Sequence, residues 1–226
     1  MGEVAADPLH ALYPHLGDGA SVRDEPDLVE SVRRKVDDHR SVVDDFFAGE
    51  TPAVAAAART LAETYRMGGR LLLMGNGGSS CDAAHVAVEF LHPVTAGRPA
   101  LTAINLTADV AMISAVGNDL GFAHVFVRQL LAHGRRGDCL MGLSTSGNSA
   151  NLVAAFQKAR EMGVSTVGVA GGNGGEMARL GLDHCLVVDT DSVHRVQECH
   201  VVIYHVLWDL VHTLLAGDRR PPGGAA

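Results

Sequence analysis

The chain has 226 residues, of which 47% are hydrophobic, so it can bury a full core as one compact domain. Its formal net charge is -8, from 26 acidic and 18 basic residues, which argues against binding to the phosphate backbone of nucleic acids. The N-terminus lacks the basic and apolar regions of a signal peptide, and we expect no apolar window as long as a membrane span. We therefore expect neither a nucleic-acid nor a membrane partner.

The cysteines also bear on location. Cys81, Cys139, Cys185 and Cys199 are widely separated, and none forms a CxxC pair. This pattern predicts reduced thiols in a cytoplasmic protein.

The ends of the chain are rich in Gly and Pro or lack a sustained period, so we expect loose tails at residues 1–25 and 217–226. A single domain is predicted between them, over residues 26–216. Its first part, residues 26–69, has apolar residues at helical spacing. Gly49 and the Thr51-Pro52 pair interrupt this stretch, so it predicts two helices before the first strand.

After this helical pair, short apolar runs alternate with longer helical stretches. The runs predict five strands, over residues 70–75, 99–106, 137–144, 164–171 and 183–189. Continuous apolar strands separated by helices are typical of a parallel sheet buried on both faces. The predicted fold is therefore a three-layer α/β/α sandwich. In such sheets ligands bind beyond the carboxyl ends of the strands, which places residues 76–80 and 144–149 on one rim.

The segment "GLSTSGNSAN" passes from a strand into a helix and carries four hydroxyl groups. Ser144, Thr145, Ser146 and Ser149, with the unpaired amides of a helix start, favour a phosphate monoester. The alternative is a Ser/Asn helix cap on a flexible turn. The other glycine-rich loop, "GNGGSSCDAAH", lacks the lysine of a Walker loop and the third glycine of a dinucleotide fingerprint, so nucleotide binding is disfavoured.

Two helices carry polar groups in apolar surroundings. His85 and Glu89 are four residues apart, so they share a helix face and could both contact one metal ion or substrate. The last long helix, about residues 192–215, carries further candidates: His194, Gln197, Glu198, His200, His205 and His212. The sequence pattern alone does not indicate which of these residues is functional. Gln197 and His205 lie about 12 Å apart on a straight helix, so a shared ion would require a bend, a long reach or another subunit.

Taken together, the motifs "GNGGSSCDAAHVAVE", "AVGNDLGF", "GLSTSGNSAN" and "RVQECHVVIYH" strongly resemble, in order and spacing, the phosphoheptose isomerases of the sugar isomerase (SIS) domain superfamily. The resemblance covers about residues 30–215. It implies a homotetramer with active sites between subunits and zinc as the cofactor. The implied zinc ligands are His85, Glu89, Gln197 and His205.

The resemblance also implies an activity, the conversion of sedoheptulose 7-phosphate to D-glycero-D-manno-heptose 7-phosphate through an enediol, for nucleotide-activated heptose synthesis. Glu89 and His205 would form the base and acid pair, and zinc would polarise the carbonyl oxygen. The implied substrate-binding residues are Asn76, Gly77, Gly78, Ser79, Glu89, Asn118, Asp119, Ser144, Thr145, Ser146, Ser149 and Gln197.

The chain departs from the family pattern at two places. After Glu89 it reads "FLHPVTAGRPAL", in which Arg98 is the only arginine, and His194 stands where the family usually has an acidic residue. Two alternatives remain open: a non-catalytic SIS regulatory protein of the type that associates with a replication initiator, and an isomerase of another sugar phosphate. Because the early helices and residues 193–215 are strongly apolar, we expect association of subunits, with Glu89 and His205 supplied by different chains.

Overall fold

The computed structural model describes residues 28–217, so the tail predicted at residues 1–25, and all of the tail predicted at residues 217–226 except Gly217, lie outside the described residues. The chain divides after Val36 into two units. Of the first unit, the described part is the beginning of helix α2, where Glu30 and Arg33 form an ion pair one turn apart, 3.8 Å between Oε2 and Nη1. Everything else below concerns the second unit, from Asp37 onward.

The predicted pair of N-terminal helices is wrong, because one helix, α2 (Leu28–Arg66), runs through Gly49 and Pro52. Proline removes one backbone donor, and the Thr51 hydroxyl donates a hydrogen bond to the carbonyl of Phe47 beside it. Apolar side chains are buried on both sides of the proline, among them Phe46 before it and Val54 after it. Burial of this continuous apolar face outweighs the local cost of the proline.

The predicted five-stranded parallel sheet is confirmed. The strands are β1 (Leu71–Gly75), β2 (Ala103–Asn105), β3 (Cys139–Ser144), β4 (Ser165–Gly171) and β5 (His184–Val188). They pair in the order β2-β1-β3-β4-β5, every neighbouring pair being parallel. The second strand is shorter than predicted, since only three residues of the apolar run pair with β1.

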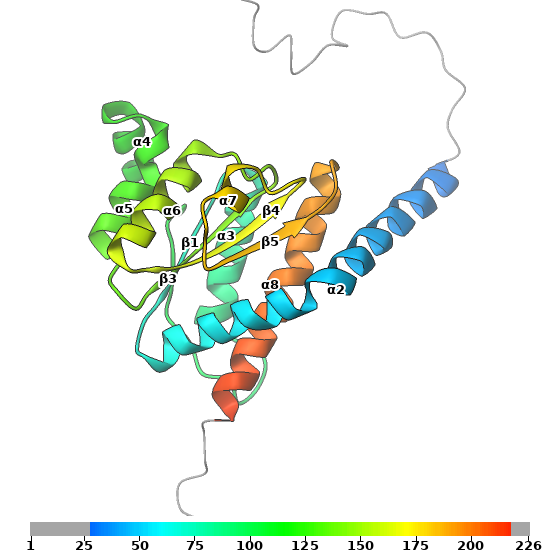
Figure 1. Cartoon of the computed structure of the whole chain (residues 1–226), viewed down its shortest axis with the longest axis horizontal. Coiled ribbons are helices and arrows are strands. Elements are labelled where there is room, and N and C mark those ends of the chain that lie inside the picture. Colours follow the sequence, from blue (N-terminus) through cyan, green and yellow to red (C-terminus); the bar gives the residue numbers. More distant parts are fainter. Residues whose placement is uncertain (1–27, 218–226) are drawn as a thin grey trace, which may run out of the picture. The chain divides into compact units, whose positions relative to one another are not determined.

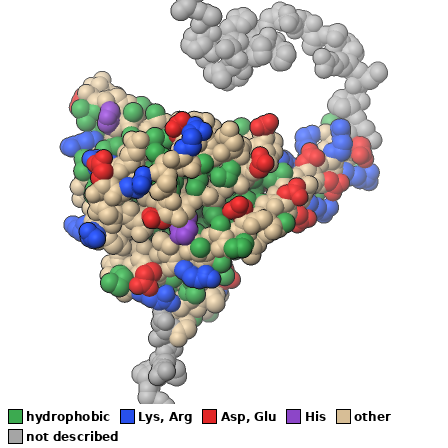
Figure 2. Space-filling model, in the orientation of Figure 1, with side chains coloured by type: hydrophobic (Ala, Val, Ile, Leu, Met, Phe, Trp, Pro, Cys, Tyr) green, Lys and Arg blue, Asp and Glu red, His purple; other side chains and the backbone are tan. Residues whose placement is uncertain are grey.

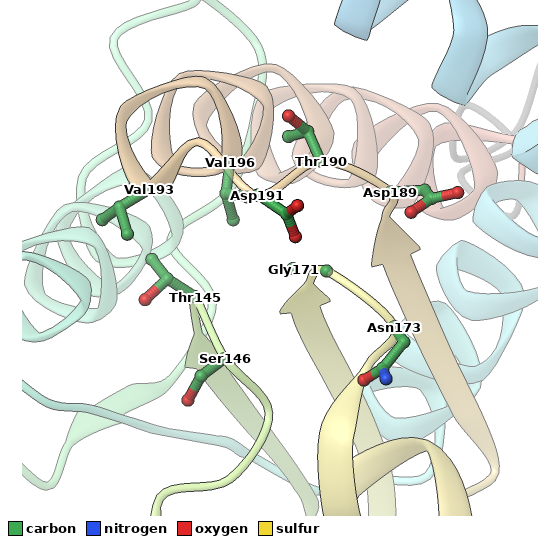
Figure 3. Close-up of a pocket in the computed structure, with 10 residues that line it drawn as sticks. Thr145, Ser146, Gly171, Asn173, Asp189, Thr190, Asp191, Val193 and Val196 are labelled. Atoms are coloured by element: carbon green, nitrogen blue, oxygen red, sulfur yellow. The ribbon is translucent and has the colours of Figure 1, made fainter.

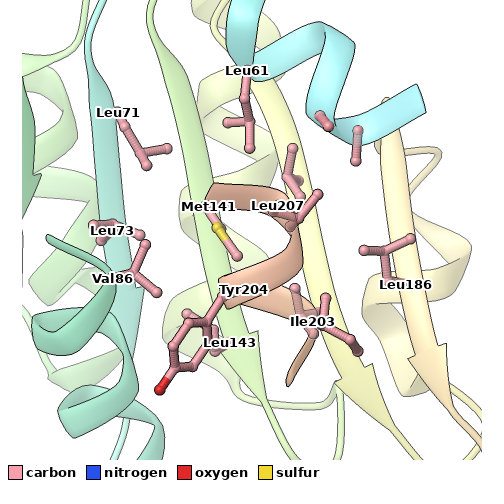
Figure 4. Close-up of a cluster of buried hydrophobic side chains, with 14 of the residues drawn as sticks. Leu61, Leu71, Leu73, Val86, Met141, Leu143, Leu186, Ile203, Tyr204 and Leu207 are labelled. Carbon is pink, nitrogen blue, oxygen red and sulfur yellow. The ribbon is translucent and has the colours of Figure 1, made fainter. Parts of the chain in front are cut away.

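Helices cover both faces of the sheet, as Figure 1 shows. They are α3 (Gly78–Leu91), α4 (Val110–Asp119), α5 (Val125–His133), α6 (Ala150–Met162), α7 (Gly175–Arg179) and α8 (Val193–Ala216), with a short 3-10 turn at Phe122–His124. Leu71 and Leu73 of β1 join the core under α2, α3 and α8, shown in Figure 4, whereas Leu72 and Met74 join a second core under α4 to α7. The three-layer sandwich is therefore confirmed.

Helix α8 corrects the expectation about apolar windows, because by length and composition alone it could cross a membrane. The structure gives this apolar character another reason. Val196, Ile203, Leu207 and Val211 are almost fully buried in the core under the sheet. By composition alone, a core helix that is buried on one side cannot be distinguished from a membrane-spanning helix.

The surface carries both signs of charge. On the face seen in Figure 2, acidic and basic side chains are interspersed with apolar ones rather than gathered into one basic patch. This distribution agrees with the excess of acidic residues in the whole chain.

The strand order also positions the loops. The chain leaves β1 toward β2 at one edge and then returns to β3 on the other side of β1, so β1 and β3 flank the switch point of the sheet. Ligands of open α/β sheets bind at such a point, outside the carboxyl ends of the strands. The two predicted loops, residues 76–80 and 144–149, begin there.

Candidate active site

Helices α3 and α8 bring three of the predicted residues together. His85 and Glu89, one turn apart on α3, lie 3.4 Å apart between Nε2 and Oε1. The ring of His205, from α8, lies with its centroid 5.1 Å from that of His85. One ligand atom from each of the three residues lies within 4.8 Å of the others. Packing of α8 against α3 therefore selects His205 from the several histidines of α8.

A hydrogen bond orients His85. Its Nδ1 lies 2.8 Å from the hydroxyl of Tyr204, which is 2% exposed. Burial raises the pKa of Tyr204, and the carboxylates of Asp82 and Glu89 raise it further, so the phenol stays protonated at neutral pH. The contact turns Nε2 of His85 toward Glu89 and His205.

Gln197 lies near the other end of the same helix pair. A Cβ atom on Gly78, the first residue of α3, would stand 2.2 Å from Nε2 of Gln197, so a larger residue there would displace this amide. Gly78 and His85 are seven residues apart on one helix, so about 10 Å of helix axis separates their Cα atoms.

The loop after β1 is built on glycine and on one amide pair. Gly77 has φ of 52°, which favours glycine, and its carbonyl accepts a hydrogen bond from Ser80 Oγ at 2.7 Å. The Asn76 side chain exchanges two hydrogen bonds of 2.9 Å with the side chain of Asn151, which is buried at the start of α6. Ser79 is buried as well.

Asn151 is a residue of the site that the sequence analysis missed. It belongs to the motif "GLSTSGNSAN", and its place at the end of a serine loop was the available signal. Its amide joins the loop after β1 to the loop after β3, so the two predicted ligand loops form one rim.

The serine loop after β3 makes its own hydrogen bonds. Ser144 Oγ accepts from the Gly147 amide at 3.1 Å and lies 3.2 Å from Ser149 Oγ, and Ser146 Oγ accepts from the Asn148 amide at 3.2 Å. Ser149 occupies the N-cap position of α6, yet its side chain makes no capping hydrogen bond. The alternative of a simple serine cap is thus not what the structure shows.

A cavity of about 400 Å³ opens beside this loop, as Figure 3 shows. Thr145 and Ser146 line one side, and Asp189 and Asp191, which follow β5, line another. Gly147, with φ of 65°, holds the serine loop against the loop after β4, because a Cβ there would lie 2.0 Å from the carbonyl oxygen of Gly174. Asn173 and Thr190 also line the cavity, and no sequence motif marked them.

Two predicted substrate residues lie elsewhere. Asn118 and Asp119 end helix α4, where both are exposed and the Asn118 amide donates to the Asp119 carboxylate at 2.8 Å. Within residues 28–217, the side-chain hydrogen bond of these two residues joins them to each other and not to the histidine cluster or the serine loop.

Comparison with known proteins agrees with this architecture. The SIS domain family matches residues 36–171. Phosphoheptose isomerase of Geotalea daltonii is 39% identical over 193 residues, 85% of this chain and 100% of that protein. Phosphoheptose isomerase of Chlorobaculum parvum is 47% identical over 169 residues, 74% of this chain and 80% of that protein.

Solved structures give the same result. The phosphoheptose isomerase of Francisella tularensis has a TM-score of 0.80 at 32% identity, over 83% of this chain and 100% of that one. The enzyme of Neisseria gonorrhoeae has a TM-score of 0.78 at 34% identity, over 82% of this chain and 99% of that one. The fold and the site thus define a SIS domain protein of the sugar isomerase class. Within that class, the chain belongs to the phosphoheptose isomerase family.

One expectation about the site needs correction. We expected Glu89 and His205 to come from different subunits, but both stand in one cluster of a single chain. Gln197 and His205 are eight residues apart on α8, and they contact different parts of α3. Gln197 lies at Gly78, whereas His205 lies at His85.

Proposed function

We propose that this aldose–ketose isomerase converts sedoheptulose 7-phosphate to D-glycero-D-manno-heptose 7-phosphate, for nucleotide-activated heptose synthesis. The observation that carries the proposal is the cluster of His85, Glu89 and His205, because it contains a carboxylate and an imidazole suited to proton transfer. The relatives from Geotalea daltonii and Chlorobaculum parvum are named phosphoheptose isomerases, which supports the substrate.

The chemistry requires a proton to move between neighbouring carbons. In the proposed mechanism Glu89 takes the proton from one carbon, which leaves an enediol, and returns it to the adjacent carbon. His205 moves the matching proton between the two oxygens, so the ketone of the substrate becomes the aldehyde of the product without net gain or loss of protons. A base and an acid within reach of one substrate are what this sequence of steps needs.

The cluster suits a zinc ion. Two imidazoles and one carboxylate are ligands that zinc prefers, and their ligand atoms already lie within 4.8 Å of one another. The hydroxyl of Tyr204 is the hydrogen-bond partner of Nδ1 of His85, which leaves Nε2 for the metal. Zinc-bound histidines usually have such a partner on the ring nitrogen that does not bind the metal. Zinc held by these residues would polarise the carbonyl oxygen of the sugar. The proposal includes Gln197 as the fourth ligand, although its amide lies at Gly78 here.

The distal phosphate would bind at the rim of the sheet. The hydroxyls of Thr145 and Ser146 line a cavity at the start of α8, where Val196 precedes His205 by nine residues, about 14 Å along the helix. We assign the phosphate to Ser144, Thr145, Ser146 and Ser149, and the sugar to Asn76, Gly77, Gly78, Ser79, Glu89 and Gln197.

The proposed assembly is a homotetramer in the cytoplasm. Val88 and Leu91 leave about half of their side chains exposed on α3, and Val94 is 80% exposed just after it, which favours contact with other subunits. In such an assembly the exposed Asn118 and Asp119 would reach the substrate of a neighbouring subunit. The four cysteines are free thiols in the structure, in agreement with a reducing compartment.

The test is an assay of purified protein with sedoheptulose 7-phosphate, with and without zinc after chelation, following formation of the aldose. We expect turnover that chelation lowers and zinc restores. Ribulose 5-phosphate and fructose 6-phosphate serve as matched ketose substrates. Preference for either would assign another sugar phosphate, and no turnover of any of them would favour a non-catalytic SIS protein.

A further inference from the structure

The helix that carries Glu89 ends two residues after it, so the last carbonyls of α3 need partners outside the helix. The carbonyl of Val88 accepts from the His92 amide, and that of Phe90 accepts from the Leu101 amide, both at 2.8 Å. The carbonyl of Glu89 accepts instead from a side chain, the indole Nε1 of Trp208 on α8, at 2.8 Å. Trp208 therefore fastens the backbone of Glu89 to the helix that carries His205.

Arg98 in turn holds Trp208. Its guanidinium carbon lies 4.4 Å from the centroid of the indole ring, and its Nη2 pairs with the carboxylate of Asp209. The other terminal nitrogen of the guanidinium group, Nη1, is buried without a hydrogen-bond partner among the described residues. Burying a guanidinium in this way has a cost, which stacking on the indole and the ion pair with Asp209 offset.

Arg98 lies in the segment after Glu89 where the sequence departs from the family pattern. The structure directs its side chain to Trp208 and Asp209. This part of the chain thus supports α8 from outside, next to the end of α3.

Two hydrogen bonds set the register of α3 and α8. Tyr204 contacts His85, and Trp208, one turn further along α8, contacts Glu89, one turn further along α3. Both pairs are four residues apart on their helices, so each spans about 6 Å of helix axis. The cluster of His85, Glu89 and His205 lies between these two contacts.

We propose that Trp208 is a positioning residue for Glu89, and that Arg98 keeps the indole in the orientation that this requires. The inference rests on the proposed role of Glu89 as base and zinc ligand. A displacement of about 1 Å at a catalytic group can cost up to roughly a hundredfold in rate, so the backbone contact of Glu89 affects turnover although Trp208 itself does not touch the reacting atoms.

The first experiment compares Trp208→Phe with Leu210→Ala. The phenylalanine keeps an aromatic ring but removes the N–H donor, and Leu210, a partly buried residue of the same helix, packs against the core. We expect Trp208→Phe to lower kcat about tenfold with KM changed less than twofold. Leu210→Ala should lower the melting temperature and leave kcat unchanged. Equal kcat in wild type and Trp208→Phe would overturn the proposal.

A second readout does not depend on turnover. Outer partners of metal ligands typically change metal affinity by 10-fold to 100-fold, so zinc titration by calorimetry should show about tenfold weaker binding for Trp208→Phe than for Leu210→Ala. If the wild-type protein turns over none of the sugar phosphates, the proposed function fails while this titration still decides the role of Trp208. Equal zinc affinity in both variants would then overturn the inference.

The role of Arg98 has its own test, because Trp208 is the only tryptophan of the chain. Arg98→Met uncovers the indole, so its emission maximum should move to longer wavelength. Since Arg98 acts through Trp208, the double variant Arg98→Met/Trp208→Phe should have the same kcat as Trp208→Phe alone. An unchanged emission spectrum, or additive losses in kcat, would refute the part assigned to Arg98.

Discussion

At the scale of single residues, the environment of Glu89 gives its carboxylate a defined place. Its side chain is 22% exposed and faces the His85 ring from one turn further along α3. A group that is partly shielded from water and still open to a ligand can both exchange a proton and hold a metal.

Glu89→Gln keeps the shape of the side chain and removes its basicity. We expect kcat to fall at least roughly a hundredfold, the usual scale for loss of an acid–base group, with the melting temperature nearly unchanged. Glu63→Gln, at an exposed glutamate of α2 that pairs with Arg66, is the matched control and should retain full activity. Turnover near that of the control would remove Glu89 from the mechanism.

His200 is a buried histidine outside the cluster. It is fully buried on α8, and this burial lowers its pKa to about 4, an effect that the nearby backbone of Ala170 opposes only in part. Since the unfolded chain has a histidine pKa of about 6.5, the neutral ring stabilises the fold above that pH. This contribution is lost as the pH falls from about 6.5 toward 4.

The expected loss from His200 is on the order of 3 kcal/mol over that pH interval. Urea unfolding of the wild type between pH 7.5 and 4.5 should show this fall in the free energy of unfolding. His200→Leu should flatten the curve, because it removes the titrating ring. The prediction fails if the two proteins lose stability in parallel over this interval.

At the scale of elements, the serine loop leads into helix α6 without a side-chain cap at the start of the helix. Ser149 stands at the N-cap position without capping the helix and contacts Ser144 instead. By contrast, Asp109 caps α4, since its carboxylate accepts from the Met112 amide at 2.9 Å. Substitutions of Ser149 and of Asp109 can therefore distinguish a loss of ligand binding from a loss of helix capping.

Ser146→Ala combined with Ser149→Ala should raise KM for the sugar phosphate severalfold, because hydroxyls that would bind the phosphate are lost. The melting temperature should change little, since no capping bond is removed. Asp109→Ala should do the opposite, lowering the free energy of unfolding by about 1 kcal/mol and leaving KM unchanged. If the serine variant lost stability and kept its KM, the capping interpretation would be right after all.

At the scale of the whole molecule, a complete cluster in one chain changes what subunit mixing can achieve. Inactive Glu89→Gln subunits and inactive His205→Ala subunits each lack one residue of every cluster that they can form. No mixed assembly contains a cluster with both residues. We therefore expect no recovery of activity on mixing.

The measurement mixes the two variants under conditions where fluorescently labelled wild-type subunits are seen to exchange. A positive control mixes either variant with wild type, which should give activity in proportion to the wild-type clusters. Return of activity in the mixture of the two variants would mean that base and acid come from different chains in solution. Light scattering of the same samples reports whether the protein is a tetramer.

Much of this protein follows from local patterns in its sequence. The apolar runs that form β1, β3, β4 and β5 are continuous because both faces of the sheet are covered, and the pattern predicts them with small errors at their ends. The spacing of His85 and Glu89 on one helix face is likewise local. Such signals need only the period of a strand or helix.

Other features depended on packing between distant parts of the chain. The helix boundary expected at Pro52 disappears because a continuous apolar face is buried on both sides of it. Nothing in the local pattern of α8 distinguishes His205 from His200 or His212, since all three stand on an apolar helix. The choice is made when Ile203 and Leu207 enter the core and fix the rotation of α8 against α3.

The contacts of Asn151, Tyr204 and Trp208 also depend on packing between distant parts of the chain. Each joins residues between 75 and 119 positions apart in the chain. A sequence period carries information over a few residues, whereas such contacts require the rotation, register and separation of two packed elements. The sequence by itself thus determined the fold class, the ligand rim and the His85–Glu89 pair, and only the tertiary structure decided which side chains complete and hold the cluster, because helix packing alone sets that geometry.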